Sequence, residues 1–211
     1  MKTHIASLII LCLVLAAVPA LAQTLYENGP INGSEYGWLI SFGYITSDTF
    51  TLSSNSTVGG FEFGVWEVPG DVLSSVDWSI TALENGGTVL GSGTASGKNL
   101  IDTFLYENPF GFNVDEITVT GLNVGLLGGT YWLNLQNAMV PSGDPVWWDE
   151  NHGAGCQSGG CPSMASQVAI GTIYSEAFTI TGSGTTPEPS SFMLFGSAIL
   201  GLAGVLRRKL L

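Results

Sequence analysis

Short segments of alternating apolar and polar residues, separated by turn residues, run through most of this 211-residue chain. In such a segment every second side chain points the same way, which is the pattern of a strand with one buried face. The segments lie at 36–42, 48–54, 58–68, 72–83, 87–96, 99–107, 112–122, 129–139, 166–174 and 176–181. Between two of them, Asn85-Gly86 is typical of a tight hairpin turn. No segment between the chain ends has the helical apolar period of about 3.6 residues. Many short strands at roughly ten-residue spacing predict an all-β fold, an antiparallel two-sheet sandwich of the jelly-roll or immunoglobulin-like kind.

The segment FEFGVWEV shows the alternation most clearly. Its phenylalanines and Val65 share the side that we expect to face the core, and Glu62 lies on the other side. Gly64 marks a bulge or kink, and with that irregularity Glu67 also faces solvent. This segment therefore predicts a strand with one apolar face and one acidic face.

The same two glutamates are the candidate pair for a glycosidase, which needs two carboxylates. Without a bulge between Glu62 and Glu67, their separation along a strand places them on opposite faces, where they cannot act on one bond. His152 is the one histidine outside the first 22 residues, and it lies in a glycine-rich stretch with no nucleophile elbow. The sequence therefore predicts no catalytic residues.

The first 22 residues have the pattern of a secretory signal peptide. Residues 1–4 are short and basic, residues 5–18 are apolar, and residues 20–22 supply the small side chains that precede cleavage. We expect cleavage before residue 23, which exports the domain that follows. The alternative is an uncleaved N-terminal membrane anchor.

The charge of the chain is strongly lopsided. Of the five basic residues only Lys98 lies within 23–184, whereas sixteen of the seventeen acidic residues lie there. Nucleic-acid binding needs lysine and arginine to displace phosphate counterions, so this composition excludes nucleic acid as a partner. The net charge of −12 favours solubility outside the cell.

Two cysteines, Cys156 and Cys161, remain after removal of the signal peptide. An exported protein meets an oxidising compartment, and the flexible residues between them permit closure, so we expect a local disulfide. A metal pair and two free thiols are the alternatives. The spacing matches no standard zinc pattern, and we expect no zinc centre.

Residues 140–166 form a long stretch without clear alternation, and long loops often carry function. Two adjacent indoles lie there beside carboxylates and amides. In a strand one indole faces the core, and the other can stack on a sugar ring while its neighbours bind the hydroxyls or calcium. The candidate glycan or calcium contacts are Asp144, Trp147, Trp148, Asp149, Glu150 and Asn151. The alternative is one indole in the core, one covering a sheet edge, and solvated acids.

The chain ends with TPEPSS, an apolar run at about 190–206 and the basic residues 207–209. As a helix, the apolar residues 192–206 span about 22 Å, which is short for a bilayer core of about 30 Å. Flanking arginines that snorkel bring the segment closer to a full span. We expect a single C-terminal transmembrane helix with its basic end in the cytoplasm.

This ending resembles the PEP-CTERM sorting signal of bacterial exported proteins. The matching residues of the motif and the basic tail are Pro187, Glu188, Pro189, Arg207, Arg208 and Lys209. The resemblance covers 187–211 and implies that a membrane-embedded exosortase recognises the tail and processes it near the motif. It also implies an association with extracellular polysaccharide and biofilm. The residues upstream are similar to β-domains carried by such proteins, a similarity that supplies no catalytic residues.

We therefore expect a signal peptide at 1–22, a secreted β-sandwich domain at 23–184 and a sorting signal at 185–211. The expected function is that of a non-enzymatic surface or matrix protein, in the cell membrane before processing and at the cell surface or in the matrix afterwards. The expected partners are an exosortase-type enzyme, the membrane and extracellular polysaccharide, with no cofactor unless calcium binds. The alternatives are a glycan- or calcium-binding module that uses the 144–152 loop and, less favoured, a secreted glycoside hydrolase.

Overall fold

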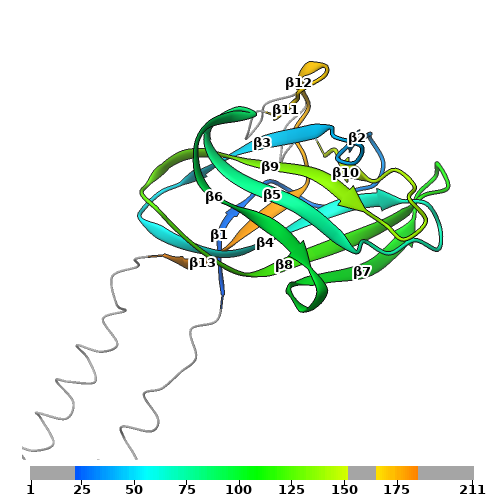
Figure 1. Cartoon of the computed structure of the whole chain (residues 1–211), viewed down its shortest axis with the longest axis horizontal. Coiled ribbons are helices and arrows are strands. Elements are labelled where there is room, and N and C mark those ends of the chain that lie inside the picture. The colour runs from blue at the N-terminus through cyan, green and yellow to red at the C-terminus, as the bar shows by residue number, and fades with distance from the viewer. Residues whose placement is uncertain (1–21, 152–164, 185–211) are drawn as a thin grey trace, which may run out of the picture.

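The computed structural model describes residues 22–151 and 165–184. They form two antiparallel β-sheets packed face to face (Figure 1). The all-β, two-sheet prediction is confirmed. The described residues contain one 3-10 helix, η1 (Gly97–Asn99), and no helix among them is long and apolar enough to cross a membrane. Residues 1–21 of the expected signal peptide, the expected C-terminal transmembrane helix and both cysteines of the expected disulfide lie outside the described residues.

The strands follow one another along the chain with short connections. They are β1 (Gln23–Glu27), β2 (Gly37–Leu39), β3 (Ile45–Leu52), β4 (Ser56–Glu67), β5 (Ser75–Leu83), β6 (Gly86–Ser96), β7 (Leu100–Glu107), β8 (Asn113–Leu126), β9 (Gly129–Met139), β10 (Trp147–Asp149), β11 (Ala165–Gln167), β12 (Gly171–Ile173) and β13 (Phe178–Gly184).

Strand β4 organises the first sheet. Along one side it pairs with β8, which pairs in turn with the edge strand β7. Along the other side, β13 pairs with the first part of β4 and β10 with its last part. Strands β1 and β2 complete that side of the sheet. The second sheet has the order β12-β11-β3-β9-β5-β6, and it covers the inner face of the first.

The core lies between the two sheets and uses the inward-facing residues of both. Phe61, Phe63 and Val65 of β4 are buried, as the alternation predicts. They belong to one apolar cluster with Leu133 of β9. Trp148 of β10 closes this cluster, with its ring edge-to-face against Phe63 at a centroid distance of 6.1 Å.

The prediction that Glu67 faces solvent is wrong. The register of β4 against β8 slips before Gly60 and is regular from there to Glu67, so Gly64 forms no bulge. Glu67 therefore lies on the inward face of the sheet, where it is fully buried. Gly64 instead leaves room for the side chain of Ile31, which would lie 2.8 Å from a Cβ at this position.

Two turn positions explain where strands begin and end. The predicted hairpin at Asn85 is confirmed, with positive φ angles of 48° at Asn85 and 79° at Gly87. The segment 166–174, predicted as one strand, is the hairpin of β11 and β12. Its turn ends at Gly171, whose φ of 95° is a conformation that glycine adopts without steric cost.

Strands β1 and β13 bring the two chain ends together. Gln23 pairs with Gly182, and Gly184 pairs with Ser56, the first residue of β4. Figure 1 shows the start of β1 and the end of β13 at the same end of the sandwich. Strand β4 then runs for twelve residues to Glu67, on the order of 35 Å away. We name the end of the sandwich at Glu67 the distal end.

Candidate functional site

Three acidic side chains converge at the distal end, on the core-facing side of the first sheet. Asp115 of β8 pairs with Val65, so it lies diagonally beside Glu67 on the same face. Asp102 of β7 lies diagonally beside Asp115, whose direct partner on β7 is Phe104. One carboxylate oxygen from each acid lies within 4.8 Å of the other two. Glu67, Asp102 and Asp115 are the carboxylate cluster.

Two of the three acids are buried with oxygens that have no hydrogen-bond partner among the described residues. Glu67 is 0% exposed and both of its oxygens lack a partner, and Asp115 is 2% exposed with its Oδ1 unpartnered. Asp102 is half-buried, and its Oδ2 accepts a hydrogen bond of 2.6 Å from the backbone N–H of Leu73. Burying an ionised carboxylate without a partner is strongly unfavourable, so the cluster needs protons or a cation.

The electrostatics of the cluster reflect this crowding. Burial, followed by the like charges of Asp102, Asp115 and Asp71, raises the pKa of Glu67 to about 8. Burial and then the charge of Asp102 raise the pKa of Asp115 to about 6. Burial also raises the pKa of Asp102, against the lowering effect of the Leu73 amide. Without a cation, the cluster holds at least one proton at neutral pH.

Strand β10 carries the two adjacent tryptophans, and it directs them to opposite faces. Trp148 pairs with Val65 and is fully buried in the core, where its indole N–H donates to the Ala177 carbonyl over 3.0 Å. Trp147 is half-buried on the outer face, where its ring meets that of Phe112 at a centroid distance of 5.0 Å. Both indoles therefore have packing contacts within the domain.

Asp149 lies on the outer face with Trp147, yet it is fully buried. Its Oδ1 accepts from the indole N–H of Trp66 over 2.6 Å and from the Gly33 amide over 3.0 Å. Its Oδ2 accepts from the Asn32 amide over 2.9 Å. Burial raises the pKa of Asp149 to about 6, although these three donors lower it. The carboxylate therefore fastens the segment after β1 onto the outer face of the sheet.

The other candidate contacts of this loop lie in separate places. Glu150 is buried, and its Oε2 accepts from the indole N–H of Trp38 over 2.6 Å. Asn151 is buried and donates to two backbone carbonyls in the segment after β1. Asp144 is half-buried at the distal end. Of the six candidate contacts, Asp144 and Trp147 keep appreciable exposed surface.

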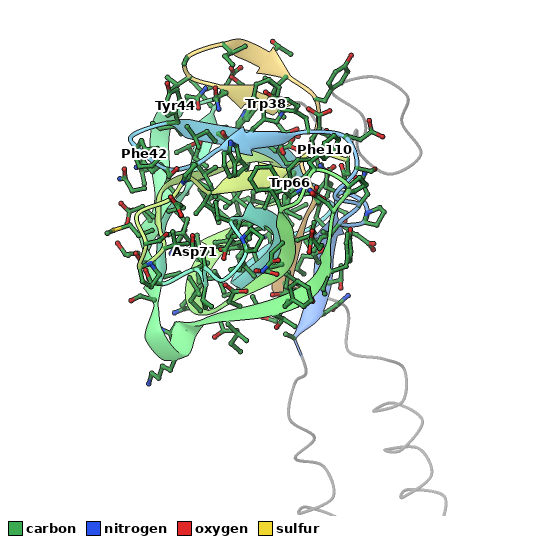
Figure 2. All side chains as sticks on the ribbon, turned by 90° about the vertical axis from the view of Figure 1, so that its right-hand side faces the viewer. Trp38, Phe42, Tyr44, Trp66, Asp71 and Phe110 are labelled. Carbon is green, nitrogen blue, oxygen red and sulfur yellow. The ribbon has the colours of Figure 1, made fainter. Side chains whose placement is uncertain are left out.

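A hollow of about 320 Å³ lies beside Asp144 at the distal end. Its lining comprises Phe42, Asn137, Ala138, Met139, Val140, Gly143 and Asp144. Phe42 is 65% exposed and has a φ of 55°, a backbone conformation that is strained for a bulky side chain. Figure 2 looks onto this end of the sandwich and shows Phe42, Tyr44 and Phe110 at its surface. The distal end therefore presents aromatic rings to solvent.

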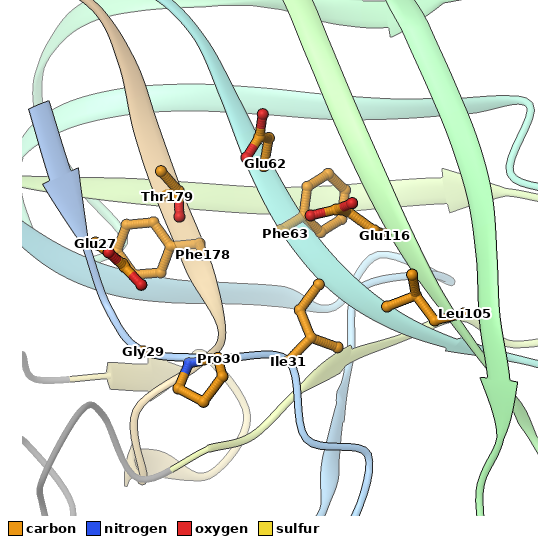
Figure 3. A pocket seen from close by; sticks show the side chains of 10 residues that line it. All are labelled: Glu27, Gly29, Pro30, Ile31, Glu62, Phe63, Leu105, Glu116, Phe178 and Thr179. Atoms are coloured by element: carbon orange, nitrogen blue, oxygen red, sulfur yellow. The ribbon is translucent and has the colours of Figure 1, made fainter. Parts of the chain in front are cut away.

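A second hollow, of about 260 Å³, lies on the outer face of the first sheet (Figure 3). Glu27, Glu62 and Glu116 contribute carboxylates to it from three different strands. Burial, and then the charge of Glu116, raises the pKa of Glu62. Glu67 points to the opposite side of the sheet, so the structure does not bring the Glu62 and Glu67 pair into one site.

A known family model matches the last segment of the chain. The family model described as the PEP-CTERM protein-sorting motif matches residues 185–209. The match includes every residue that the sequence pattern singled out there, namely Pro187, Glu188, Pro189, Arg207, Arg208 and Lys209. The chain carries a PEP-CTERM sorting signal. Such a signal marks an exported protein for sorting by exosortase, and here it follows directly after β13. No curated protein matches the chain.

Sequence reasoning did not find the carboxylate cluster of this PEP-CTERM protein. The signal was present in the alternation, because Glu67 follows Val65 in phase and Asp115 precedes Ile117 in phase. Both acids therefore occupy positions that alternation assigns to the core. The composition was a second signal, since Lys98 is the only lysine or arginine within 23–184 that could pair with them.

Proposed function

We propose that this chain is a non-enzymatic protein of the cell surface or extracellular matrix, delivered there by its sorting signal and associated with extracellular polysaccharide. The observation that carries the proposal is the PEP-CTERM motif at 185–209, placed directly after the last strand of the sandwich. The sandwich is then the exported domain, and the tail is the signal that sorts it. The acidic composition supports a soluble existence outside the cell.

Before processing, the apolar segment 190–206 holds the protein in the cell membrane, and the basic residues 207–209 stay on the cytoplasmic side. After processing, the sandwich is released to the surface or the matrix. The segment is short for a span, which suits a handle for a processing enzyme better than a permanent anchor.

The test is cell fractionation in a host that has an exosortase. We compare the wild type with Glu188→Ala and with a chain that lacks 185–211, and Glu84→Ala is the matched control because this exposed glutamate lies outside the motif. The expected result is an unprocessed, membrane-bound Glu188→Ala protein and a secreted tail-less protein, with the control like the wild type. Wild-type processing and location of Glu188→Ala, together with a wild-type location of the tail-less chain, would overturn the proposal.

A second candidate function is glycan binding at the distal end, supported by the hollow between Phe42 and Asp144. An exposed phenyl ring can stack on a sugar face, and the amide of Asn137 and the carboxylate of Asp144 can bind its hydroxyls. Phe42 keeps an unfavourable positive φ although its ring lies in solvent. Strained residues of this kind cluster at ligand-binding sites, which supports a binding role for this side chain. The negative charge of the domain favours a neutral glycan, because an acidic polymer would be repelled.

The test of this second candidate is a glycan array followed by titration of the best ligand. Phe42→Ala is expected to weaken binding about tenfold, the effect of losing about 1.4 kcal/mol of contact. Phe104→Ala is the matched control, because this phenylalanine is also exposed but lies on the edge strand β7. An equal loss in both variants, or no glycan signal with the wild type, contradicts the assignment.

The hydrolase alternative requires two carboxylates at one bond. Glu62 and Glu116 share the outer hollow, whereas Glu67 lies across the sheet from them. Hydrolysis of a polysaccharide by the wild type, abolished by Glu62→Gln but not by Glu67→Gln, would replace the non-enzymatic proposal.

A further inference from the structure

We propose that the carboxylate cluster of Glu67, Asp102 and Asp115 binds one divalent cation with a preference for oxygen ligands, which we identify as calcium. This inference does not depend on the sorting function, since it rests on the sandwich alone. It also differs from a calcium site in the 144–152 loop, where Asp149 is already bound by three donors.

The first argument is the state of the buried oxygens. Glu67 is fully buried, and neither of its oxygens has a hydrogen-bond partner among the described residues. Asp115 has a buried, unpartnered Oδ1, and one of its oxygens lies within 4.8 Å of oxygens of Glu67 and Asp102. Buried carboxylates are normally paired or bound to a metal, so three buried oxygens without donors on two neighbouring acids indicate a missing positive charge.

The second argument is that the domain has almost no basic residues with which to neutralise them. Lys98 is the only lysine or arginine within 23–184, and its side chain is exposed. The charges that act on Glu67 are those of Asp102, Asp115 and Asp71, all of the same sign. A counter-charge for this cluster therefore has to come from solution.

The third argument concerns which cation fits. All three ligand groups are carboxylates, which suit calcium and magnesium, whereas zinc in proteins prefers nitrogen and sulfur. Calcium accepts six to eight oxygens in flexible geometry, and carboxylates that can bind in one- or two-oxygen fashion supply several of them. Magnesium requires a near-ideal octahedron and keeps its waters, which a buried group such as Glu67 accommodates poorly. Half-buried Asp102 is the member of the cluster that solvent can reach.

The site joins three strands and the loop above them. Its ligands come from the end of β4, from β7 and from β8. Asp102 also accepts a hydrogen bond from the Leu73 amide in the loop between β4 and β5. In that loop, Oδ2 of Asp71 accepts a hydrogen bond of 2.7 Å from the Ser142 hydroxyl, which connects the loop to the 140–144 turn. A bound cation therefore cross-links the strands beneath the aromatic surface at the distal end.

The test uses the full chain in detergent, treated with a chelator and then titrated with CaCl₂ or MgCl₂ in calorimetry and thermal unfolding. We expect one calcium per chain with Kd of about 10⁻⁴ to 10⁻³ M, the range of extracellular modules. At saturation Tm should rise by about 5 °C. Glu67→Gln and Asp115→Asn should each weaken calcium binding at least tenfold.

Matched controls on the same strands are Glu62→Gln and Glu116→Gln, which face the outer side and should bind calcium like the wild type. If Asp115→Asn does not fold, Glu67→Gln decides, because a neutral amide there relieves repulsion and keeps the shape. Absence of calcium heat and of any Tm change in the wild type overturns the proposal. So does calcium binding that survives in Glu67→Gln, or binding of magnesium as tight as that of calcium.

Discussion

The indole N–H of Trp66 donates a 2.6 Å hydrogen bond to Oδ1 of Asp149, which ties the end of β4 to β10 on the outer face of the first sheet. Two backbone amides of the segment after β1, those of Asn32 and Gly33, converge on the same carboxylate. Asp149 of β10 thus connects β4 with the segment after β1, which lies far from it in the sequence.

Removing that acid should be costly. In Asp149→Ala three buried donors lose their acceptor, and we expect the free energy of unfolding to fall by about 3 kcal/mol, since hydrogen bonds to charged groups are stronger than neutral ones. Asp144→Ala, at a half-buried position of the same loop, should change it by less than about 0.5 kcal/mol. Urea unfolding followed by tryptophan fluorescence measures both, and equal losses would contradict the structural role of Asp149.

The stability of the sandwich should fall with rising pH because of Glu176. This side chain is fully buried, and burial followed by the like charges of Asp48, Glu150 and Asp149 raises its pKa well above the ordinary value of 4.5. The folded state therefore holds the proton more tightly than the unfolded chain does. Its contribution to stability is fully present below about pH 4.5 and is lost as pH rises through the folded pKa.

Glu176→Gln removes this dependence because an amide does not ionise. The variant should be more stable than the wild type at about pH 8, and the difference should shrink towards pH 4. Denaturant unfolding at several pH values between these limits measures it. A difference of constant size across the range would show that the ionisation of Glu176 is not its cause.

Phe42 should be a position where stability and binding oppose each other. Its φ of 55° costs a non-glycine residue about 1 kcal/mol, so Phe42→Gly is expected to stabilise the fold by roughly that amount. The same change removes the exposed ring and should weaken glycan binding about tenfold, as Phe42→Ala does. Tyr44→Gly, at a neighbouring exposed residue without positive φ, should not stabilise the protein. Thermal unfolding of the two variants separates these outcomes.

Gly182 should tolerate no side chain. A Cβ at this position would collide with the backbone carbonyl of Thr57 and lie 2.9 Å from the Gly59 nitrogen, where β13 shifts register against β4. We expect Gly182→Ala to destabilise the sandwich by about 1–3 kcal/mol, the usual range for overpacking. Gly125→Ala, which has nothing within 4 Å of its Cβ, is the control and should be close to neutral. Similar Tm values for the two variants would contradict this account.

The alternation of apolar and polar residues was enough to predict the sandwich, because it depends only on residues two positions apart in the sequence. It correctly directed Phe63 and Val65 to the core and separated Trp147 from Trp148. It was wrong at Glu67, where a glycine was taken for a bulge although it only makes room for a loop. A glycine in a strand has both explanations, and the sequence does not distinguish them.

The rest depended on which strands become neighbours. The carboxylate cluster exists because Asp102 lies on β7, which pairs with β8, and Asp115 lies on β8, which pairs with β4. The order of strands in a sheet cannot be predicted from the local alternation of residues. Asp149 was expected in solvent in the simplest interpretation, and it is buried because the segment after β1 folds back over it. Such long-range packing is the part that a single sequence leaves open.

The pairing of β1 with β13 makes completion of the first sheet depend on the last strand of the domain. The first strand of the chain has its hydrogen-bond partner in the last one, so β1 has no partner in the sheet until the whole domain is present. Strand β13 also covers one edge of β4, which exposes a second template for unwanted pairing until that moment. The sorting motif follows β13 directly in the sequence. Removal of 185–211 therefore leaves the pairing of β13 with β1 and β4 intact, whereas a truncation that also removes β13 exposes the edges of both strands.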